Sequence, residues 1–325
     1  MTAKTWRWGM IGCGDVTERK SGPAYQQARN SELVAVWARR PEQATAYAAR
    51  HRVATVCANL EDLLNHDTVD AIYIATPPAS HPELAEKVAG AGKPCCIEKP
   101  LANTGVETEA ITSAFEAAGQ PLFVAYYRRS LPRFAQIGAW IDAGEIGAVR
   151  HVEWRLTREP NATDLAGLPN WRTEIEAAPG GYFDDLACHG LDLFDHLIGP
   201  LVEASGQATH QHTLYTSPSA FAASWQHANG ATGSGFWNFA AFGHEDHVRI
   251  LGSHGEIRFS VFDDAALEVV TEAGTTRIMI DNPDPVQLPH VEGMVTHLNG
   301  GAPHPSLASN SLRIARALDA IRGPR

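Results

Sequence analysis

The chain has 325 residues, and at about 150 residues per domain this length predicts two domains. Hydrophobic residues make up 44% and charged residues 19% of the chain, a globular composition that excludes a largely disordered protein. The formal net charge of −11 disfavours nucleic acid as the main partner, because the phosphate backbone is itself negative.

Short apolar runs alternate with helical patterns over residues 1–125. The runs have the length of strands and are apolar throughout, as expected of strands covered on both faces: Trp8–Ile11, Leu33–Trp37, Ala71–Ala75, Cys95–Ile97 and Leu122–Tyr126. The helical patterns between them are Pro41–Arg52, Glu61–Leu64, Pro82–Ala91 and Val106–Ala118. This alternation predicts an α/β domain with a parallel sheet and right-handed crossovers.

Residues 126–325 have a different pattern, and we assign them to a second, α+β domain. Helices are expected at Pro132–Ala143, Asp185–Ile198 and Leu307–Ile321, and a strand at Val149–Thr157. Turn signals such as Asn229-Gly230 and Ala273-Gly274 between short alternating runs predict antiparallel strands joined by hairpins. The runs are Ser224–His227, Gly235–Phe239, Val248–Leu251, Glu256–Phe259, Leu267–Val270 and Thr276–Ile280.

The five cysteines are an odd number without any CxxC spacing, which argues against a disulfide scaffold and against a zinc site. We interpret them as small apolar residues in a reducing cytoplasm, and the adjacent Cys95 and Cys96 as buried strand residues, with a redox pair as the alternative. The N-terminal segment lacks the features of a signal peptide, and no uncharged apolar stretch reaches the roughly 18 residues of a membrane span. The sequence therefore predicts a soluble cytoplasmic protein without a membrane partner.

A glycine turn follows the first predicted strand and precedes a helix. Gly12 and Gly14 flank Cys13, and Asp15 and Val16 continue the turn. In this context the backbone can approach a pyrophosphate closely, which predicts a dinucleotide site. The third position of the fingerprint carries Thr17 instead of glycine or alanine, and a glycine turn without a ligand is the alternative.

Arginines stand where the cofactor ribose is expected. The second strand ends at Trp37, and Arg39 and Arg40 follow without a nearby carboxylate. A carboxylate here would suit the ribose 2′-hydroxyl of NAD, whereas arginine suits the 2′-phosphate of NADP. We therefore predict NADP(H) as the preferred cofactor, with NAD(H) possible. The alternative is that both arginines only solvate a helix start.

Two further turns follow predicted strands. Thr76, Pro77 and Pro78 come directly after the third long strand and lead to His81. Glu98 and Lys99 come directly after the next. A lysine at this sheet edge would face the nicotinamide end of a cofactor and could stabilise a developing alkoxide. Each residue on its own has a simpler interpretation: His81 is a polar residue at a helix start, and Lys99 is a surface residue.

The segment Gly180–Asp192 carries the second group of candidates. Asp185, His189 and Asp192 are spaced i, i+4 and i+7, which places them on one face of the predicted helix. A histidine beside a carboxylate can act as a general base. The alternatives are acidic residues that only complement a helix N-terminus, and a metal site of one histidine and two carboxylates.

Together these motifs resemble the Gfo/Idh/MocA oxidoreductase family. The resemblance runs in order over roughly residues 7–195 and includes the glycine turn, the Ala75–His81 turn, Glu98-Lys99-Pro100 and the Asp185–Asp192 helix. Tyr127-Arg128-Arg129 and Trp171-Arg172 also match positions of the family. Thr17, and Ala187 in place of a common glycine, depart from its pattern.

The resemblance implies an N-terminal Rossmann domain, a C-terminal domain with a large open sheet, and a homodimer or homotetramer formed through that sheet. It implies Lys99, Asp185 and His189 as the catalytic residues, with His189 the acid or base. Tyr127, Tyr182, Asp185 and His189 are expected in the substrate pocket. The predicted cofactor-binding residues are Gly12, Cys13, Gly14, Asp15, Val16, Arg39, Arg40, Thr76, Pro77, Pro78, His81, Glu98, Lys99, Arg128, Trp171 and Arg172.

The function that follows is an NADP(H)-dependent oxidoreductase without a metal, acting on a secondary alcohol or carbonyl of a sugar, cyclic polyol or dihydrodiol. Three alternatives stay open at this point. They are a glycosidase that uses transient oxidation by a tightly held dinucleotide, a non-catalytic dinucleotide sensor, and a metal enzyme built on Asp185, His189 and Asp192.

Overall fold

The computed structural model describes residues 3–323, which form two compact units. Unit 1 contains the described residues up to Ala102, then Val106–Leu131 and Pro283–Ser311. Unit 2 contains Asn103–Gly105, Pro132–Asn282 and the described residues from Leu312 onward. Segment 283–311, which the sequence analysis places in the second domain, thus groups with unit 1.

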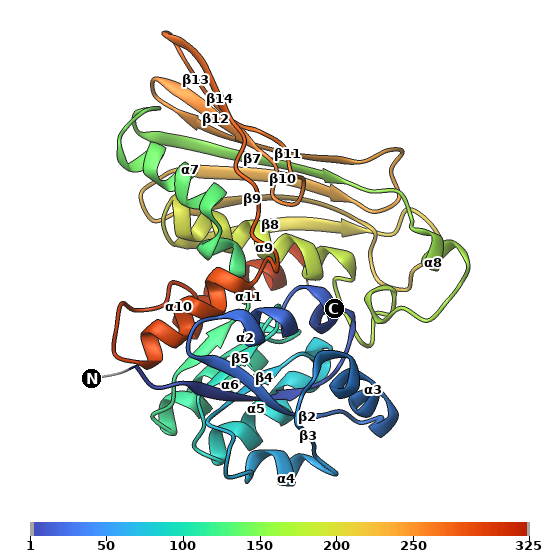
Figure 1. Ribbon diagram of the computed structural model, residues 1–325. Helices are drawn as coiled ribbons and strands as arrows, with labels where there is room; N and C mark the ends of the chain where they lie inside the picture. Colours follow the sequence, from blue (N-terminus) through green and yellow to red (C-terminus); the bar gives the residue numbers. More distant parts are fainter. Residues whose placement is uncertain (1–2, 324–325) are drawn as a thin grey trace. The chain divides into compact units, whose positions relative to one another are not determined.

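Unit 1 is built on a six-stranded parallel sheet with the order β3-β2-β1-β4-β5-β6 (Figure 1). Its strands are β1 (Trp6–Ile11), β2 (Ser31–Trp37), β3 (Thr55–Val56), β4 (Ala71–Ile74), β5 (Cys95–Ile97) and β6 (Leu122–Val124). This is the doubly wound order of dinucleotide-binding domains, in which the order reverses beside β1. The expected parallel α/β sheet is confirmed.

The helices of unit 1 cover both faces of this sheet. They are α1 (Asp15–Arg19), α2 (Gly22–Gln27), α3 (Pro41–His51), α4 (Leu60–Leu64), α5 (His81–Gly90), α6 (Gly105–Ala117) and α10 (Leu288–Leu298). Helices α2 and α10 were not predicted from the sequence. Val291 and Met294 of α10 are fully buried in the same core cluster as Trp8 and Tyr25, which is why segment 283–311 belongs to unit 1.

Unit 2 is built on an eight-stranded sheet with the order β14-β13-β12-β11-β7-β10-β9-β8. Its strands are β7 (Val149–Thr157), β8 (Leu201–Thr209), β9 (Ala220–His227), β10 (Thr232–Asn238), β11 (Glu245–Gly252), β12 (Gly255–Phe259), β13 (Leu267–Thr271) and β14 (Gly274–Ile278). All neighbours are antiparallel except β7 and β10, so the predicted mostly antiparallel sheet is confirmed.

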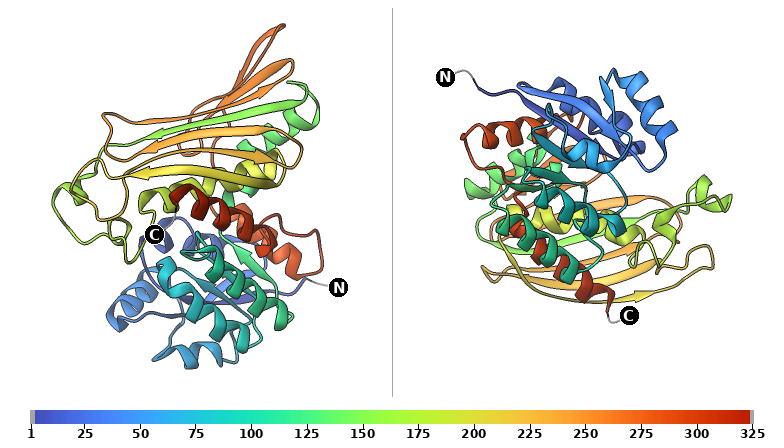
Figure 2. Two further views of the ribbon diagram at one scale, coloured as in Figure 1. Left: turned by 180° about the vertical axis from the view of Figure 1, so that it is seen from behind. Right: turned by 90° about the horizontal axis from the view of Figure 1, so that it is seen from below.

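The helices of unit 2 are α7 (Pro132–Asp142), α8 (Ala162–Leu165), α9 (Tyr182–Leu197) and α11 (Ser311–Arg322), and α9 runs along one face of the sheet (Figures 1 and 2). Gly190 of α9 lies against the ring of Trp154 in β7, where an added Cβ would come within 2.3 Å of the indole. Glycine here lets helix and sheet approach closely. The opposite face carries exposed residues such as Phe236. No helix within residues 3–323 is both long enough and apolar enough to cross a membrane.

Candidate active-site residues

The glycine turn after β1 has a backbone that needs glycine at its first position. Gly12 has a φ of +93°, and a Cβ on it would lie 2.7 Å from the carbonyl oxygen of Ala75. A Cβ on Gly14 would meet nothing within 4 Å. Thr17 is fully buried, and its hydroxyl donates to the Gly14 carbonyl at 2.7 Å. Threonine thus fits the third fingerprint position by folding back onto the turn, and the open backbone at Gly14 fits a bound pyrophosphate.

The neighbouring residues of the turn surround this open backbone. Cys13 is half-buried, and burial raises the pKa of its thiol to about 12, so it stays a neutral thiol at neutral pH. Asp15 and Val16 begin α1. Contact of these three residues with a cofactor stays a prediction.

Arg39 and Arg40 lie at the same sheet edge as the glycine turn, because Ile11 of β1 pairs with Trp37 of β2. Both are exposed, and Arg40 is the residue that precedes α3. Within residues 3–323 neither guanidinium forms an ion pair or a side-chain hydrogen bond. Both charges are therefore available to an anionic group beside the turn.

The turn after β4 is braced by His81. The two ring nitrogens lie 3.0 Å from the Leu101 carbonyl oxygen and 2.8 Å from that of Thr76, and the ring is fully buried. Burial lowers the pKa of this histidine. Ser80 donates to the Thr76 hydroxyl at 2.8 Å, and Pro78 begins a short 3-10 turn after Pro77. His81 therefore fixes the turn that presents Thr76, and direct contact of these residues with a cofactor stays a prediction.

The carboxylate of Glu98, directly after β5, is held by partners that the sequence analysis did not identify. Its Oε1 accepts from the Tyr73 hydroxyl at 2.7 Å and from Gln287 Nε2 at 3.1 Å. Lys99 follows, half-buried, at the carboxyl edge shared by β1, β4 and β5. Lys99 thus lies at the predicted edge, but Gln287 comes from the distant segment before α10, which no local pattern reveals.

Tyr127 and Arg128 form a short turn of 3-10 helix in unit 1. Both are buried, and the guanidinium carbon of Arg128 lies 4.9 Å from the centre of the Tyr127 ring, within the range of a cation–π contact. Their predicted roles toward substrate and cofactor are not tested by this arrangement.

In unit 2, Asp185 and His189 lie one turn apart on α9 and are 7% and 4% exposed. Asp185 Oδ2 accepts from Arg172 Nε at 2.6 Å, and the Arg172 guanidinium lies 4.4 Å from the centre of the Trp171 ring. Three separately predicted site residues are therefore joined in one cluster. A metal site with three or more histidine, cysteine, aspartate or glutamate ligands does not occur in the described part of the chain, so the proposed ligand set with Asp192 is not assembled.

The hydroxyl of Tyr182, at the start of α9, uses its full hydrogen-bonding capacity. It donates to Asp164 at 2.8 Å and accepts from Asn161 and Asn170 at 2.7 and 2.8 Å. Burial, followed by the hydrogen bond to Asp164, raises the pKa of Tyr182 to about 12. Tyr182 stays protonated at neutral pH and orders the loop before it, next to a cavity of about 290 Å³ lined by Asp164 and Asn170. Its predicted contact with substrate stays a prediction.

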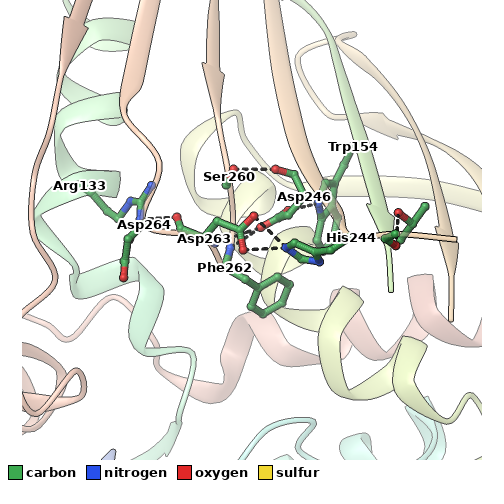
Figure 3. Close-up of polar contacts among 10 residues, drawn as sticks. Arg133, Trp154, His244, Asp246, Ser260, Phe262, Asp263 and Asp264 are labelled. Atoms are coloured by element: carbon green, nitrogen blue, oxygen red, sulfur yellow. Dashed lines mark hydrogen bonds and ion pairs between the residues drawn. The ribbon is translucent and has the colours of Figure 1, made fainter. Parts of the chain in front are cut away.

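Phe262, in the loop after β12, packs against His189 and was not predicted. The ring centres are 5.9 Å apart and the rings are nearly perpendicular, with an interplanar angle of 79°. Asp246 holds this loop, because its Oδ2 accepts the backbone N–H groups of Phe262 and Asp263 at 2.5 and 3.4 Å (Figure 3). Only the long-range packing of the sheet brings residue 262 to residue 189, so the sequence held no signal for it.

Comparisons with known proteins agree with this arrangement. Residues 6–126 match the oxidoreductase family with an NAD-binding Rossmann fold, and residues 134–258 match the Gfo/Idh/MocA C-terminal domain. The chain is 33% identical over 317 residues to oxidoreductase P35 of Formosa agariphila, which covers 97% of this chain and 98% of that protein. It is 35% identical over 144 residues to the NADP(+)-dependent scyllo-inositol 2-dehydrogenase of Bacillus subtilis, covering 44% of this chain and 43% of the other.

Among solved structures, levoglucosan dehydrogenase in complex with NADH and L-sorbose matches with a TM-score of 0.86. The match covers 97% of this chain and 95% of that one at 22% identity, a likeness that shows the fold. The fold and the matches together define an NAD(P)-dependent oxidoreductase. The chain belongs to the Gfo/Idh/MocA oxidoreductase family, which confirms the resemblance drawn from its motifs.

Proposed function

We propose that this protein is an NADP(H)-dependent oxidoreductase that interconverts a secondary alcohol and its carbonyl on a sugar, cyclic polyol or dihydrodiol. The observation that carries the proposal is α9, where Asp185 and His189 lie buried one turn apart in a chain that also carries the glycine turn and Lys99. The name of the inositol dehydrogenase relative supports the substrate class, because that protein acts on a cyclic polyol.

The residues have distinct roles in this proposal. A bound nicotinamide accepts hydride from the carbinol carbon, or donates it to the carbonyl carbon in the opposite direction. In oxidation His189 takes the hydroxyl proton, and the Lys99 ammonium stabilises the negative charge that develops on the oxygen. In reduction His189 returns the proton. The hydrogen bond from Arg172 holds the Asp185 carboxylate in place. In this proposal the carboxylate lies beside the substrate.

The first prediction tests these roles. His189→Ala and Lys99→Ala should each lower kcat by roughly 10²–10⁴-fold, since each removes a group that acts in the transition state. The measurement is nicotinamide absorbance during turnover of the best substrate from a panel of sugars, inositols and dihydrodiols. His196→Ala, an exposed histidine of α9, and Lys87→Ala, an exposed lysine of α5, are the matched controls. Near-normal turnover by both site variants would contradict the proposal.

The glycosidase alternative differs in its products. A chain that uses transient oxidation releases a leaving group from a glycoside without net consumption of added cofactor, and its dinucleotide leaves the protein only on denaturation. Net formation of NADPH or NADP⁺ in proportion to product favours the dehydrogenase. A dinucleotide sensor would bind the cofactor and show neither reaction.

We also propose a homodimer or homotetramer that forms through the open face of the unit 2 sheet. This face carries a groove of about 310 Å³ lined by residues of β7, β9 and β10, among them Arg155, Ala222 and Phe236. An exposed apolar side chain in a shallow groove favours burial by a partner. The five cysteines are free thiols, which fits the cytoplasmic location that we propose.

A further inference from the structure

Arg158 follows the last residue of β7 and lies on the buried side of the sheet. In β7 the alternate residues Val152, Trp154 and Leu156 are fully buried. Arg158 continues this alternation, and its backbone N–H donates to the Asn238 carbonyl at 2.9 Å, which extends the pairing of β7 with β10. The side chain therefore lies on the face that α9 covers.

The charge of Arg158 has no counter-ion in the described part of the chain. Several other arginines of unit 2 are paired with carboxylates, among them Arg155 with Glu245 at 3.3 Å, Arg172 with Asp185 at 2.6 Å and Arg249 with Glu256. Arg158 forms no ion pair or side-chain hydrogen bond with residues 3–323, and its Nε is buried without a hydrogen-bond partner. A partly buried guanidinium without partners is unfavourable, unless a ligand supplies the negative charge.

The Phe262 ring contacts both this guanidinium and His189. The Arg158 guanidinium carbon lies 5.2 Å from the centre of the Phe262 ring. The centre of the His189 ring lies 5.9 Å from the same point, and the two rings are nearly perpendicular. One aromatic ring therefore contacts both the unpaired cation and the predicted acid–base residue.

The loop that carries Phe262 is fixed from two sides (Figure 3). Asp246 accepts from its backbone and from the Trp154 indole N–H at 2.9 Å. Arg133 donates to the carbonyls of Asp263 and Ala265 at 2.8 and 2.9 Å. These anchors come from β7, β11 and α7, so the Phe262 ring is held in place before any ligand binds. A preorganised ring of this kind can contribute to substrate specificity.

We propose that Arg158, supported by Phe262, forms a subsite for a carboxylate of the substrate, so that the enzyme acts on a sugar acid such as a uronate or an aldonate. The forked donors of arginine match the two oxygens of a carboxylate. A single unpaired cation balances one negative charge, whereas a phosphate dianion calls for a second, and Arg172 of the same unit is already paired with Asp185. This inference rests on the proposed function, in which His189 acts on a hydroxyl of the same substrate.

The test is equilibrium titration, which needs no turnover. D-glucuronate and D-gluconate, with D-glucose and D-glucitol as their neutral counterparts, are titrated calorimetrically into the protein saturated with NADP⁺. The wild type should bind at least one acid about tenfold or more tightly than its neutral counterpart, a preference expected of one charge-assisted contact. Arg158→Gln should lose that preference and Arg158→Lys should keep part of it. Arg150→Gln, which changes an exposed arginine near the start of β7, should leave it unchanged.

The outcomes separate this inference from the proposed function. Wild type that binds no acid more tightly than its neutral counterpart, or Arg158→Gln that keeps the preference, overturns the carboxylate subsite. If neutral polyols are then oxidised with dependence on His189 and Lys99, the proposed function stands without the subsite. If acids bind through Arg158 and turnover does not depend on His189, the subsite stands and the catalytic proposal fails.

Discussion

Gly12 has a φ of +93°, a conformation that residues with a side chain rarely adopt, and its missing Cβ leaves room for the Ala75 carbonyl. Gly12→Ala should therefore destabilise unit 1 by about 1–3 kcal/mol and weaken dinucleotide binding at the same time. Urea unfolding and titration with NADPH measure the two effects. Gly14→Ala is the matched control for stability, since Gly14 has a φ of −97° and an added Cβ meets nothing within 4 Å. Equal stability of wild type and Gly12→Ala would contradict the steric argument.

The charges of Arg39 and Arg40 decide the proposed cofactor preference. Wild type should use NADP(H) with at least several-fold higher kcat/KM than NAD(H), because a guanidinium pairs with the 2′-phosphate. The double variant Arg39→Gln/Arg40→Gln should lose most of this difference while its kcat/KM with NAD(H) changes little. Arg52→Gln, an exposed arginine just after α3, serves as the control. Equal or better use of NAD(H) by the wild type would refute the prediction.

Local context explains which site residues sequence reasoning found. Gly12, Thr76 and Lys99 each follow a buried parallel strand, and the carboxyl ends of such strands meet at one edge, so their neighbourhood was predictable. Phe262 and Arg158 gave no such signal. Phe262 follows an antiparallel strand, and its role arises only because Asp246 from another strand fixes its backbone.

At the scale of elements, β8 and α10 were missed for physical reasons. β8 contains Gly206, where a Cβ would come within 2.8 Å of the Ala222 carbonyl and of Ile321. Close packing therefore requires glycine at this position, and glycine has a low strand propensity, which hides the strand in the sequence. The α10 segment contains Pro289, Gly293 and two histidines, which mask its apolar face. Strands such as β7, whose apolar residues alternate regularly, were predicted with their correct bounds.

The packing of α10 against the segment after it predicts a pH dependence of stability. His304 is 3% exposed; its Nδ1 accepts the Ser306 N–H at 3.0 Å, and its Nε2 lies 3.1 Å from the His290 carbonyl oxygen. The ring is therefore neutral with the proton on Nε2. Burial lowers the pKa of His304 to about 4, and burial also lowers the pKa of His290.

An unfolded chain protonates His304 near pH 6.5, so between about pH 6.5 and 4 it binds a proton that the folded chain does not. Stability is fully present above pH 6.5 and is lost as the pH falls through this window, by roughly 3 kcal/mol for this group. The free energy of unfolding in urea, measured from pH 7 to pH 5, should fall less steeply for His304→Asn than for wild type. His66→Asn, which changes a half-buried histidine of unit 1 outside this packing, is the matched control. Parallel slopes for wild type and His304→Asn would exclude this role.

At the scale of the whole molecule, the open sheet of unit 2 predicts self-association. Phe236 and Val202 are 40% and 61% exposed on strands of this sheet, and the groove beside Phe236 is shallow, as expected of a surface that a second copy covers. Light scattering should give a mass of two or four times 35.1 kDa for wild type, and a lower mass for Phe236→Glu because it places a charge in the apolar contact. Phe242→Glu is the matched control, since Phe242 is 98% exposed between β10 and β11, outside the strands. A monomeric wild type, or equal dissociation by both variants, would show that this face is not the interface.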